Sequence, residues 1–373
     1  MMSTIVPLAA PGLVPAPGPH SVRFCRTRAG ARIAYAVHGD GPALVIAGCW
    51  LSHLQHDVTS PVWRHFIDFL GTIATVIRYD EQGFGLSERE VADFDLDARV
   101  DALESVVSAA GFDRFSLMGI AQGGPVAIAF AHRHPARIDR LVFYGSYAAE
   151  LPDPTAEQLE FARVLDDMIQ VGWGRADPVF RRVFTSMMIP GGGENEMRWL
   201  DELQRLAVDA GTMVRSRQAS RCADTRPLLC QLGMPALVLH SRDDRLAPFG
   251  HAVDLATNLA DARLVPFASA NHILLGDEPS WAEARVELAA FLRQSAHVTP
   301  PDDAHEGLTT LTVREKEILR HAATGLDNQG VADRLVLSVR TVERHMQNVY
   351  TKLGITGRSA RTAAVAALLR ADT

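Results

Sequence analysis

Gly119-Ile120-Ala121-Gln122-Gly123 is the stretch of sequence that decides the fold. It has the spacing of the turn G-x-S-x-G, in which a strand passes sharply into a helix and the flanking glycines let backbone segments approach closely. Alanine stands at the central position, where this turn holds a reactive serine. A methyl group cannot attack a carbonyl carbon, so the chain lacks the atom with which an ester hydrolase begins its reaction.

Apolar runs on both sides of this turn predict a buried sheet. Several of them are almost wholly apolar, which is typical of strands covered by helices on both faces. They alternate with helical segments, so we predict a parallel α/β sheet. The predicted strands are residues 32–37, 43–47, 75–79, 115–120, 141–144, 236–240 and 263–267.

The 373 residues, of which 47% are hydrophobic, suit one large domain and one small domain. Residues 1–21 are rich in proline, alanine and glycine, and we expect a loose segment. Residues 148–232 break the strand rhythm with helical segments rich in methionine and aromatic residues, which favours a cap over a pocket; extra core helices elsewhere are the alternative. Residues 296–307 are polar and contain prolines, which indicates a linker before a helical domain at 308–373.

Charge separates the two predicted domains. Residues 308–373 hold 10 Lys and Arg against 6 Asp and Glu, whereas the rest of the chain holds 27 against 38. A basic tail on an acidic body suggests that only the tail meets nucleic acid, although chance asymmetry is the alternative.

Several other features bear on location and chemistry. The sequence has no apolar run of membrane-spanning length and no leader pattern at its start, so we expect a cytoplasmic protein without a membrane partner. Its four cysteines form no C-x-x-C pair and suit reduced thiols. We expect neither a cofactor nor a metal.

The large domain resembles the α/β-hydrolase superfamily over residues 22–295. The resemblance rests on residues 79–87 (YDEQGFGLS), the turn at Ala121, an acid loop at 241–248 and a late histidine. It implies an α/β-hydrolase fold with a helical cap. In that family the catalytic triad follows the order nucleophile, acid, histidine, which here falls on Ala121, Asp244 and His272. Asp244 is preferred to Asp243 because the family's acid lies four residues before a proline, here Pro248.

The resemblance also implies roles for these residues. Asp244 would orient the imidazole of His272, and His272 would act as general base; a solvated loop aspartate and a structural histidine are the alternatives. The oxyanion site would use the backbone N–H groups of Gln122 and Cys49, with Trp50 in the same ligand-binding loop. Cys49 is conceivable as a substitute nucleophile, but it lies on the wrong loop for His272.

The tail predicts three helices in succession. Thr312 and Glu315 form a capping box, a second helix covers 328–335, and Ser338 caps a third helix. The apolar stripe of the third helix is Val342, Met346, Val349 and Leu353, and its opposite face carries Arg340, Arg344, Gln347 and Thr351. Arginine, amide and hydroxyl groups on one face suit contacts with phosphates and base edges.

Residues 308–369 resemble the LuxR/GerE-type helix-turn-helix domain. The resemblance implies that double-stranded DNA is a partner; a small helical interaction module is the alternative. An alanine-rich fourth helix at 358–369 suits the packing of two copies, and we expect a homodimer, although this helix could equally pack on its own domain. The expected DNA contacts are Ser338, Arg340, Thr341, Arg344, Gln347 and Lys352.

Together these features predict a transcriptional regulator that binds a small ester, lactone or related acyl compound in a hydrolase-like pocket. The alternative is an enzyme: a parent with serine at position 121 would hydrolyse an ester or lactone, and this chain would be a substrate-trapping variant. Either a lineage lost the serine and kept a sensor, or the serine was replaced. The presence of both Asp244 and His272 favours a recent or deliberate change.

Overall fold

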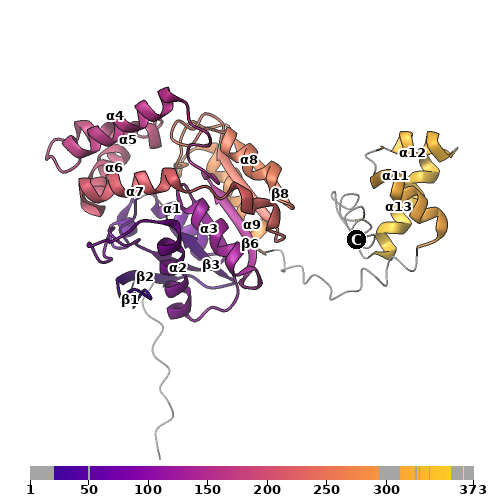
Figure 1. Cartoon of the computed structure of the whole chain (residues 1–373), viewed down its shortest axis with the longest axis horizontal. Coiled ribbons are helices and arrows are strands. Elements are labelled where there is room, and N and C mark those ends of the chain that lie inside the picture. Colours follow the sequence, from indigo (N-terminus) through magenta and orange to yellow (C-terminus); the bar gives the residue numbers. More distant parts are fainter. Residues whose placement is uncertain are drawn as a thin grey trace, which may run out of the picture. The chain divides into compact units, whose positions relative to one another are not determined.

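The computed structural model describes residues 21–48, 51–293, 311–323, 326, 328–335, 337–353 and 364. The chain divides into two compact units, Met1–Ser295 and Ala296–Thr373 (Figure 1). The first unit holds an eight-stranded sheet of order β1-β2-β4-β3-β5-β6-β7-β8. Its strands are β1 Val22–Arg26, β2 Arg32–His38, β3 Ala43–Ala47, β4 Thr75–Tyr79, β5 Phe115–Ile120, β6 Ile138–Tyr144, β7 Ala236–Ser241 and β8 Ala262–Phe267.

All seven predicted strands are present, but the prediction of a wholly parallel sheet is wrong at one edge. β1 pairs with β2, and β2 with β4, in antiparallel fashion. The link between β1 and β2 is a tight turn in which Thr27 donates its N–H to the carbonyl of Ala31 at 2.8 Å. A link this short can join only antiparallel strands. The sequence did not predict β1, because β1 is an edge strand with little buried apolar surface. The side chain of Phe24 at its centre is 53% exposed.

Helices cover both faces of the sheet. Alternate residues of β3 enter opposite cores, since Leu44 belongs to one apolar cluster and Val45 to the other. α1 (Arg64–Gly71) and α9 (Pro279–Arg293) pack in the first cluster, whereas α2 (Leu96–Ala110), α3 (Gly123–Arg133) and α8 (Gly250–Asn258) pack in the second. Short 3-10 helices lie at η1 Asp57–Thr59, η2 Pro135–Arg137 and η3 Arg226–Gln231. The predicted α/β architecture is confirmed.

Four helices are inserted between β6 and β7, within the predicted cap. They are α4 (Ala156–Gly172), α5 (Val179–Met188), α6 (Glu194–Ala207) and α7 (Ala210–Cys222), and Figure 1 shows them gathered on one side of the sheet. Their aromatic residues serve partly to pack the insertion itself, since the rings of Trp173 and Phe184 lie 5.7 Å apart in edge contact. Met188, Leu200 and Leu203 extend into the cluster that covers the sheet.

The second unit is helical, as predicted. It contains α11 (Val313–Ala323), α12 (Asn328–Leu335) and α13 (Val339–Lys352) around one small apolar cluster. Val342, Met346 and Val349 are buried in that cluster, and Leu353 packs against it. Within the described part of the chain, no helix is long and apolar enough to cross a membrane.

Candidate functional site

The turn at Ala121 joins β5 to α3 in a backbone conformation that side chains avoid. Ala121 has φ +48°, and among the described residues only Asp153 shares a positive φ without being glycine. Its N–H donates to the carbonyl of Tyr144 at 3.1 Å. A side chain at Gly123 would collide with the carbonyl oxygens of Ala47 and Gly48, so glycine is required for this close approach. The strained turn of a nucleophile elbow is therefore present, with a methyl group at its tip.

Asp244 and His272 form a buried hydrogen-bonded pair. Nδ1 of His272 lies 2.7 Å from Oδ2 of Asp244, and the two side chains are 5% and 0% exposed. The other carboxylate oxygen accepts the N–H groups of Leu246 and Ala247 at 2.8 and 3.0 Å. This arrangement leaves Nε2 as the imidazole nitrogen that does not face the carboxylate, which is the geometry a general base needs.

Neighbouring charges and hydrogen bonds lower the pKa of the Asp244 carboxyl group. Burial alone raises the pKa of this carboxyl, but the interactions with His272, the amide of Ala247 and His240 outweigh burial and hold the pKa below its usual value. His240, at the end of β7, lies with Nε2 2.7 Å from the carbonyl of Ala247. Burial lowers the pKa of His240, so the imidazole is neutral at pH 7 and its Nε2–H donates to the carbonyl of Ala247.

The loop that carries His272 is held by β6 and by the cap. The hydroxyl of Tyr144 accepts the N–H of Leu274 at 2.8 Å. The carbonyl of Met188, at the end of α5, accepts the N–H groups of His272 and Ile273 at 2.8 and 3.3 Å. Sequence reasoning missed these contacts because neither a tyrosine hydroxyl nor a helix-terminal carbonyl forms a recognisable motif.

Gly145 supports the imidazole ring and was also missed. It has φ +54°, and a Cβ added there would lie 2.7 Å from Cε1 of His272. We expect Gly145→Ala to lower the free energy of unfolding by about 2–3 kcal/mol, because it adds a steric clash to the cost of a left-handed alanine. Denaturant unfolding measures this loss.

Gly111 supplies the matched control for Gly145. It has φ +79° at the end of α2, and a Cβ there would meet nothing within 4 Å. Gly111→Ala should therefore show the backbone cost alone, about 1–2 kcal/mol. Equal losses for the two variants would mean that the ring of His272 does not rest on Gly145.

Ala121 and His272 line the same pocket, together with Leu51 and Trp63. The inserted helices contribute to this pocket, since Met188, Leu200 and Leu203 form part of its wall. Apart from His272 its wall is apolar. The structure thus brings two of the predicted site residues, Ala121 and His272, to one apolar pocket, with Asp244 hydrogen-bonded to the imidazole.

The predicted oxyanion donors are placed in part. Gln122 is the N-cap residue of α3, at the end of the helix where backbone N–H groups have no intrahelical partner. Its side chain turns to the cap instead, and Oε1 accepts a hydrogen bond from Ser220 of α7 at 3.1 Å. Cys49 and Trp50 lie outside the described residues, so the second predicted donor and its loop stay predictions.

The second unit shows the predicted helix starts. The N–H of Thr312 donates to Glu315 at 2.8 Å and the N–H of Glu315 donates to the hydroxyl of Thr312 at 3.3 Å, which confirms the capping box. Ser338 caps α13 by accepting the N–H of Thr341 at 3.1 Å, and the two hydroxyls lie 2.7 Å apart. These two hydroxyls therefore hold the start of the helix as well as lying beside its outer face.

The outer face of α13 carries the predicted arginines. Arg340, Arg344 and Gln347 are exposed and lie at helical spacing opposite the buried stripe. Lys352, another predicted DNA contact, donates its ammonium group to the buried carboxylate of Glu315 at 2.7 Å. This bond ties the end of α13 to the start of α11.

Two further predictions concern segments that lie wholly or mostly outside the described residues. The linker at 296–307 lies outside them. So does the predicted fourth helix at 358–369, except for Ala364, which is buried in the apolar cluster of its own unit. That burial favours packing within the unit, the alternative to packing between copies at this position.

Comparisons with known proteins agree with both units. Residues 42–175 match the α/β hydrolase fold family, and residues 309–365 match the luxR family of bacterial regulatory proteins. The AB hydrolase superfamily protein YisY of Bacillus subtilis is 30% identical over 205 residues, which cover 52% of this chain and 74% of that protein. A 2-hydroxymuconate semialdehyde hydrolase of a Pseudomonas strain is 27% identical over 250 residues, covering 63% of this chain and 78% of that protein.

Solved structures show the same fold. An esterase from Exiguobacterium antarcticum superposes with a TM-score of 0.63 at 17% identity, covering 72% of this chain and 98% of that one. The chain belongs to the α/β hydrolase superfamily and carries a C-terminal DNA-binding domain of the luxR family. It is a regulatory protein with a hydrolase-like domain, as the sequence predicted.

Proposed function

We propose that this protein is a one-component transcriptional regulator that binds a small ester, lactone or related acyl compound in its hydrolase-like unit. One observation carries the proposal: His272, paired with Asp244, lines an apolar pocket in which the tip of the elbow is the methyl of Ala121. Without a nucleophile, the expected remaining catalysis is about 10³ to 10⁴ over water, far below that of a competent enzyme. The unit then holds its ligand instead of cleaving it.

DNA recognition is assigned to α13 in this proposal. The exposed face of Arg340, Arg344 and Gln347 supplies the donors that contact phosphates and base edges. A homodimer would present two such helices to half-sites about 34–36 Å apart. Because Lys352 pairs with Glu315, we assign it to holding α13 in place rather than to a phosphate.

Selection from a random-sequence duplex library tests the regulator proposal. We expect the full chain to enrich a preferred sequence and to lose affinity steeply as salt rises, with a log–log slope of about −0.9 for each phosphate contact. Fluorescence anisotropy with the enriched duplex and a scrambled duplex of equal length measures both effects. Equal affinity for the two duplexes, or no binding at any salt concentration, contradicts the proposal.

A second candidate function rests on the same site. The bond between Asp244 and His272 has the geometry that a serine hydrolase uses, although nothing at position 121 reacts. Several relatives are named hydrolases or esterases. A parent with serine at position 121 would then be an ester or lactone hydrolase, and this chain its substrate-trapping variant.

A further inference from the structure

The inserted helices expose more large apolar side chains than the rest of the described chain. Ten such residues are exposed in the described ranges, and six of them lie on α4 and α5. They are Leu159, Phe161, Val164, Val171, Val179 and Val183. Single exposed apolar residues are normal on a protein, but a group of them on one part of its surface marks a contact site.

Three of the six form a stripe along α4. Phe161, Val164 and Val171 are 57%, 45% and 62% exposed, and the half-buried Met168 completes the stripe. These four residues, the α4 stripe, are spaced three, four and three positions apart. That spacing keeps side chains on one face of a helix and recurs where two helices pack against each other. The exposed Leu159 lies on another face, because only two positions separate it from Phe161.

The α4 stripe is turned away from the core of its own unit. Leu165 and Ile169, on another face of α4, are buried in the apolar cluster that covers the sheet. Figure 1 shows α4 at the outer edge of the inserted helices, farther from the sheet than α7. The start of α5 packs against the end of α4, since a Cβ at Gly172 would collide with the side chain of Phe180. The stripe therefore lies on the surface, where a partner can reach it.

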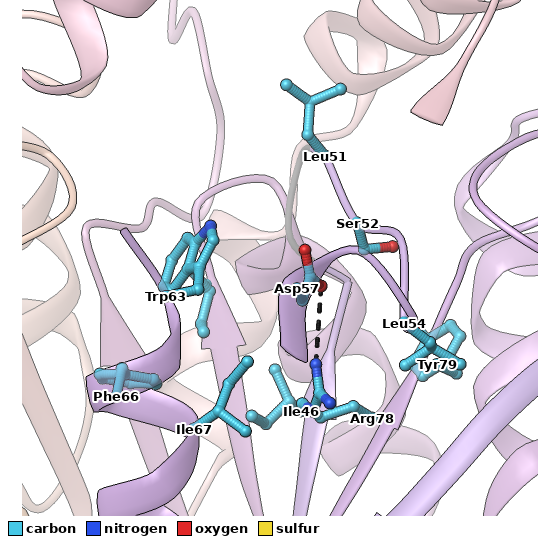
Figure 2. Close-up of a pocket in the computed structure, with 11 residues that line it drawn as sticks. Ile46, Leu51, Ser52, Leu54, Asp57, Trp63, Phe66, Ile67, Arg78 and Tyr79 are labelled. Carbon is cyan, nitrogen blue, oxygen red and sulfur yellow. Dashed lines mark ion pairs between the residues drawn. The ribbon is translucent and has the colours of Figure 1, made fainter. Parts of the chain in front are cut away.

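A small ligand in either pocket of this unit would leave the α4 stripe uncovered. The pocket at Ala121 takes part of its wall from α5 and α6. A second pocket lies between α1 and the ends of β3 and β4, and its wall contains an ion pair in which Nη1 of Arg78 lies 3.5 Å from Oδ2 of Asp57 (Figure 2). Neither lining includes a residue of α4. The partner of the stripe is consequently a larger surface.

Charged residues beside the α4 stripe argue against a membrane as that surface. Glu160 and Asp167 flank the stripe on one side, and both are exposed. Helices that lie on an anionic lipid surface carry Lys and Arg beside their apolar face, because the lipid head groups repel acidic residues. Arg163 does not reverse this balance, since its Nη2 lies 2.7 Å from Oε2 of Glu160 on the same helix. A protein partner suits these flanks, because water screens charges at the rim of an interface.

We propose that the α4 stripe is the surface through which two copies of this chain form a homodimer, with their α4 helices antiparallel across a two-fold axis. In this register Phe161 of one copy packs on Val171 of the other, and Val164 packs on Met168. Because the axis repeats each contact, every apolar residue of the stripe meets an apolar partner. A single stripe thus supplies both sides of the interface.

The charges at the two ends of α4 complement each other in the same register. Glu157 lies four residues before Phe161, and Arg175 lies four residues after Val171, just beyond the end of the helix. Both are exposed. Antiparallel pairing places Glu157 of one copy opposite Arg175 of the other, and the axis makes a second such pair. The ends of the contact therefore carry opposite charges, which favours this copy-to-copy arrangement over the parallel one.

This surface deepens the proposed function and rests on it, because a regulator that reads two half-sites needs two joined copies. The predicted alternative was the fourth helix of the second unit. Ala364 of that segment is buried in the apolar cluster of its own unit and is not available at that position. The α4 stripe instead joins the copies through the hydrolase-like unit.

Sedimentation equilibrium of the full chain tests the surface. We expect a dimer at micromolar concentration, and we expect Phe161→Glu to weaken it by at least about 100-fold, because two apolar contacts are lost and two carboxylates would be buried. Phe161 is exposed in the single chain, so this variant should fold as the parent does. A monomeric parent, or a Phe161→Glu variant that dimerises as the parent does, overturns the proposal.

Leu159→Glu is the matched control. Leu159 is 48% exposed on the same helix but lies outside the stripe, so the variant adds the same charge at a similar exposure. It should dimerise as the parent does. An equal loss in Leu159→Glu and Phe161→Glu would mean that charge on α4 matters and the stripe does not, which overturns the proposal.

A charge swap tests the antiparallel register. Glu157→Arg alone should weaken the dimer by about three- to tenfold at low salt, because two attractive pairs become repulsive. Glu157→Arg combined with Arg175→Glu restores the opposite charges and should return the affinity to that of the parent. A combined variant as weak as the single variant overturns this register.

Two further measurements separate this surface from other partners and from the proposed function. Flotation with phosphatidylglycerol vesicles should recover no protein; flotation of the parent that Phe161→Glu abolishes overturns the proposal in favour of a membrane. The duplex selection described above is independent of dimerisation through α4. A chain that dimerises through the stripe but selects no DNA sequence would contradict the regulator and leave this surface standing.

Discussion

Ala121→Ser is expected to turn the hydrolase-like unit into an esterase. The new hydroxyl would stand at the tip of the same strained turn, on the cavity that His272 also lines. Because Asp244 already holds Nδ1 of that imidazole at 2.7 Å, the base needs no rearrangement to accept the proton. We expect hydrolysis of p-nitrophenyl acetate or butyrate to rise by about 10³-fold or more over the parent, with a burst of p-nitrophenol.

Two further variants make this test specific. Ala121→Ser combined with His272→Ala should return to the rate of the parent, since the hydroxyl then has no base. Ala121→Gly should be inactive but folded, because glycine adopts φ +48° without strain. If Ala121→Ser showed no burst and no turnover on any short ester, the unit would be a sensor only, and the enzyme alternative would fail.

Arg344→Ala is expected to weaken binding to the selected duplex by about 1–3 kcal/mol, or roughly five- to 150-fold. Arg344 lies near the middle of the exposed face of α13, where a bidentate contact with a base edge is available to a guanidinium. The same variant should reduce the preference over a scrambled duplex, because a base contact carries sequence information. Anisotropy titrations at fixed salt measure both changes.

Arg320→Ala is the control for Arg344→Ala. Arg320 is an exposed arginine on α11, so its removal changes the net charge equally without touching α13. We expect a smaller loss that is the same for every duplex sequence. If both variants lost affinity equally and kept their sequence preference, α13 would not be the helix that reads bases.

Much of the fold was predictable because its signals are local. Strands such as β3, β4 and β5 are unbroken apolar runs, and buried parallel strands require that composition. The helix starts at Thr312 and Ser338 are also local, since each cap bonds a backbone group three residues away. Asp244 and His272 came instead from the family resemblance, and the structure places them in contact.

The remaining features depend on contacts between distant residues. Nothing near Asp57 in the sequence indicates that it will form an ion pair with Arg78, because the pair exists only once β4 and the segment 51–57 are assembled. The same reason explains why the bond between Lys352 and Glu315, which lies 37 residues earlier, was not predicted.

The carbonyl of Met188 accepts two successive amides of the loop that carries His272. The end of α5 and the backbone of the loop that carries His272 are consequently joined at one point, and a relative shift of about an ångström would strain or break these bonds. In the proposed sensor, a ligand that displaced α5 would therefore be expected to move the loop that carries His272 relative to Gly145. We expect the NMR resonances of the His272 ring to report such a displacement.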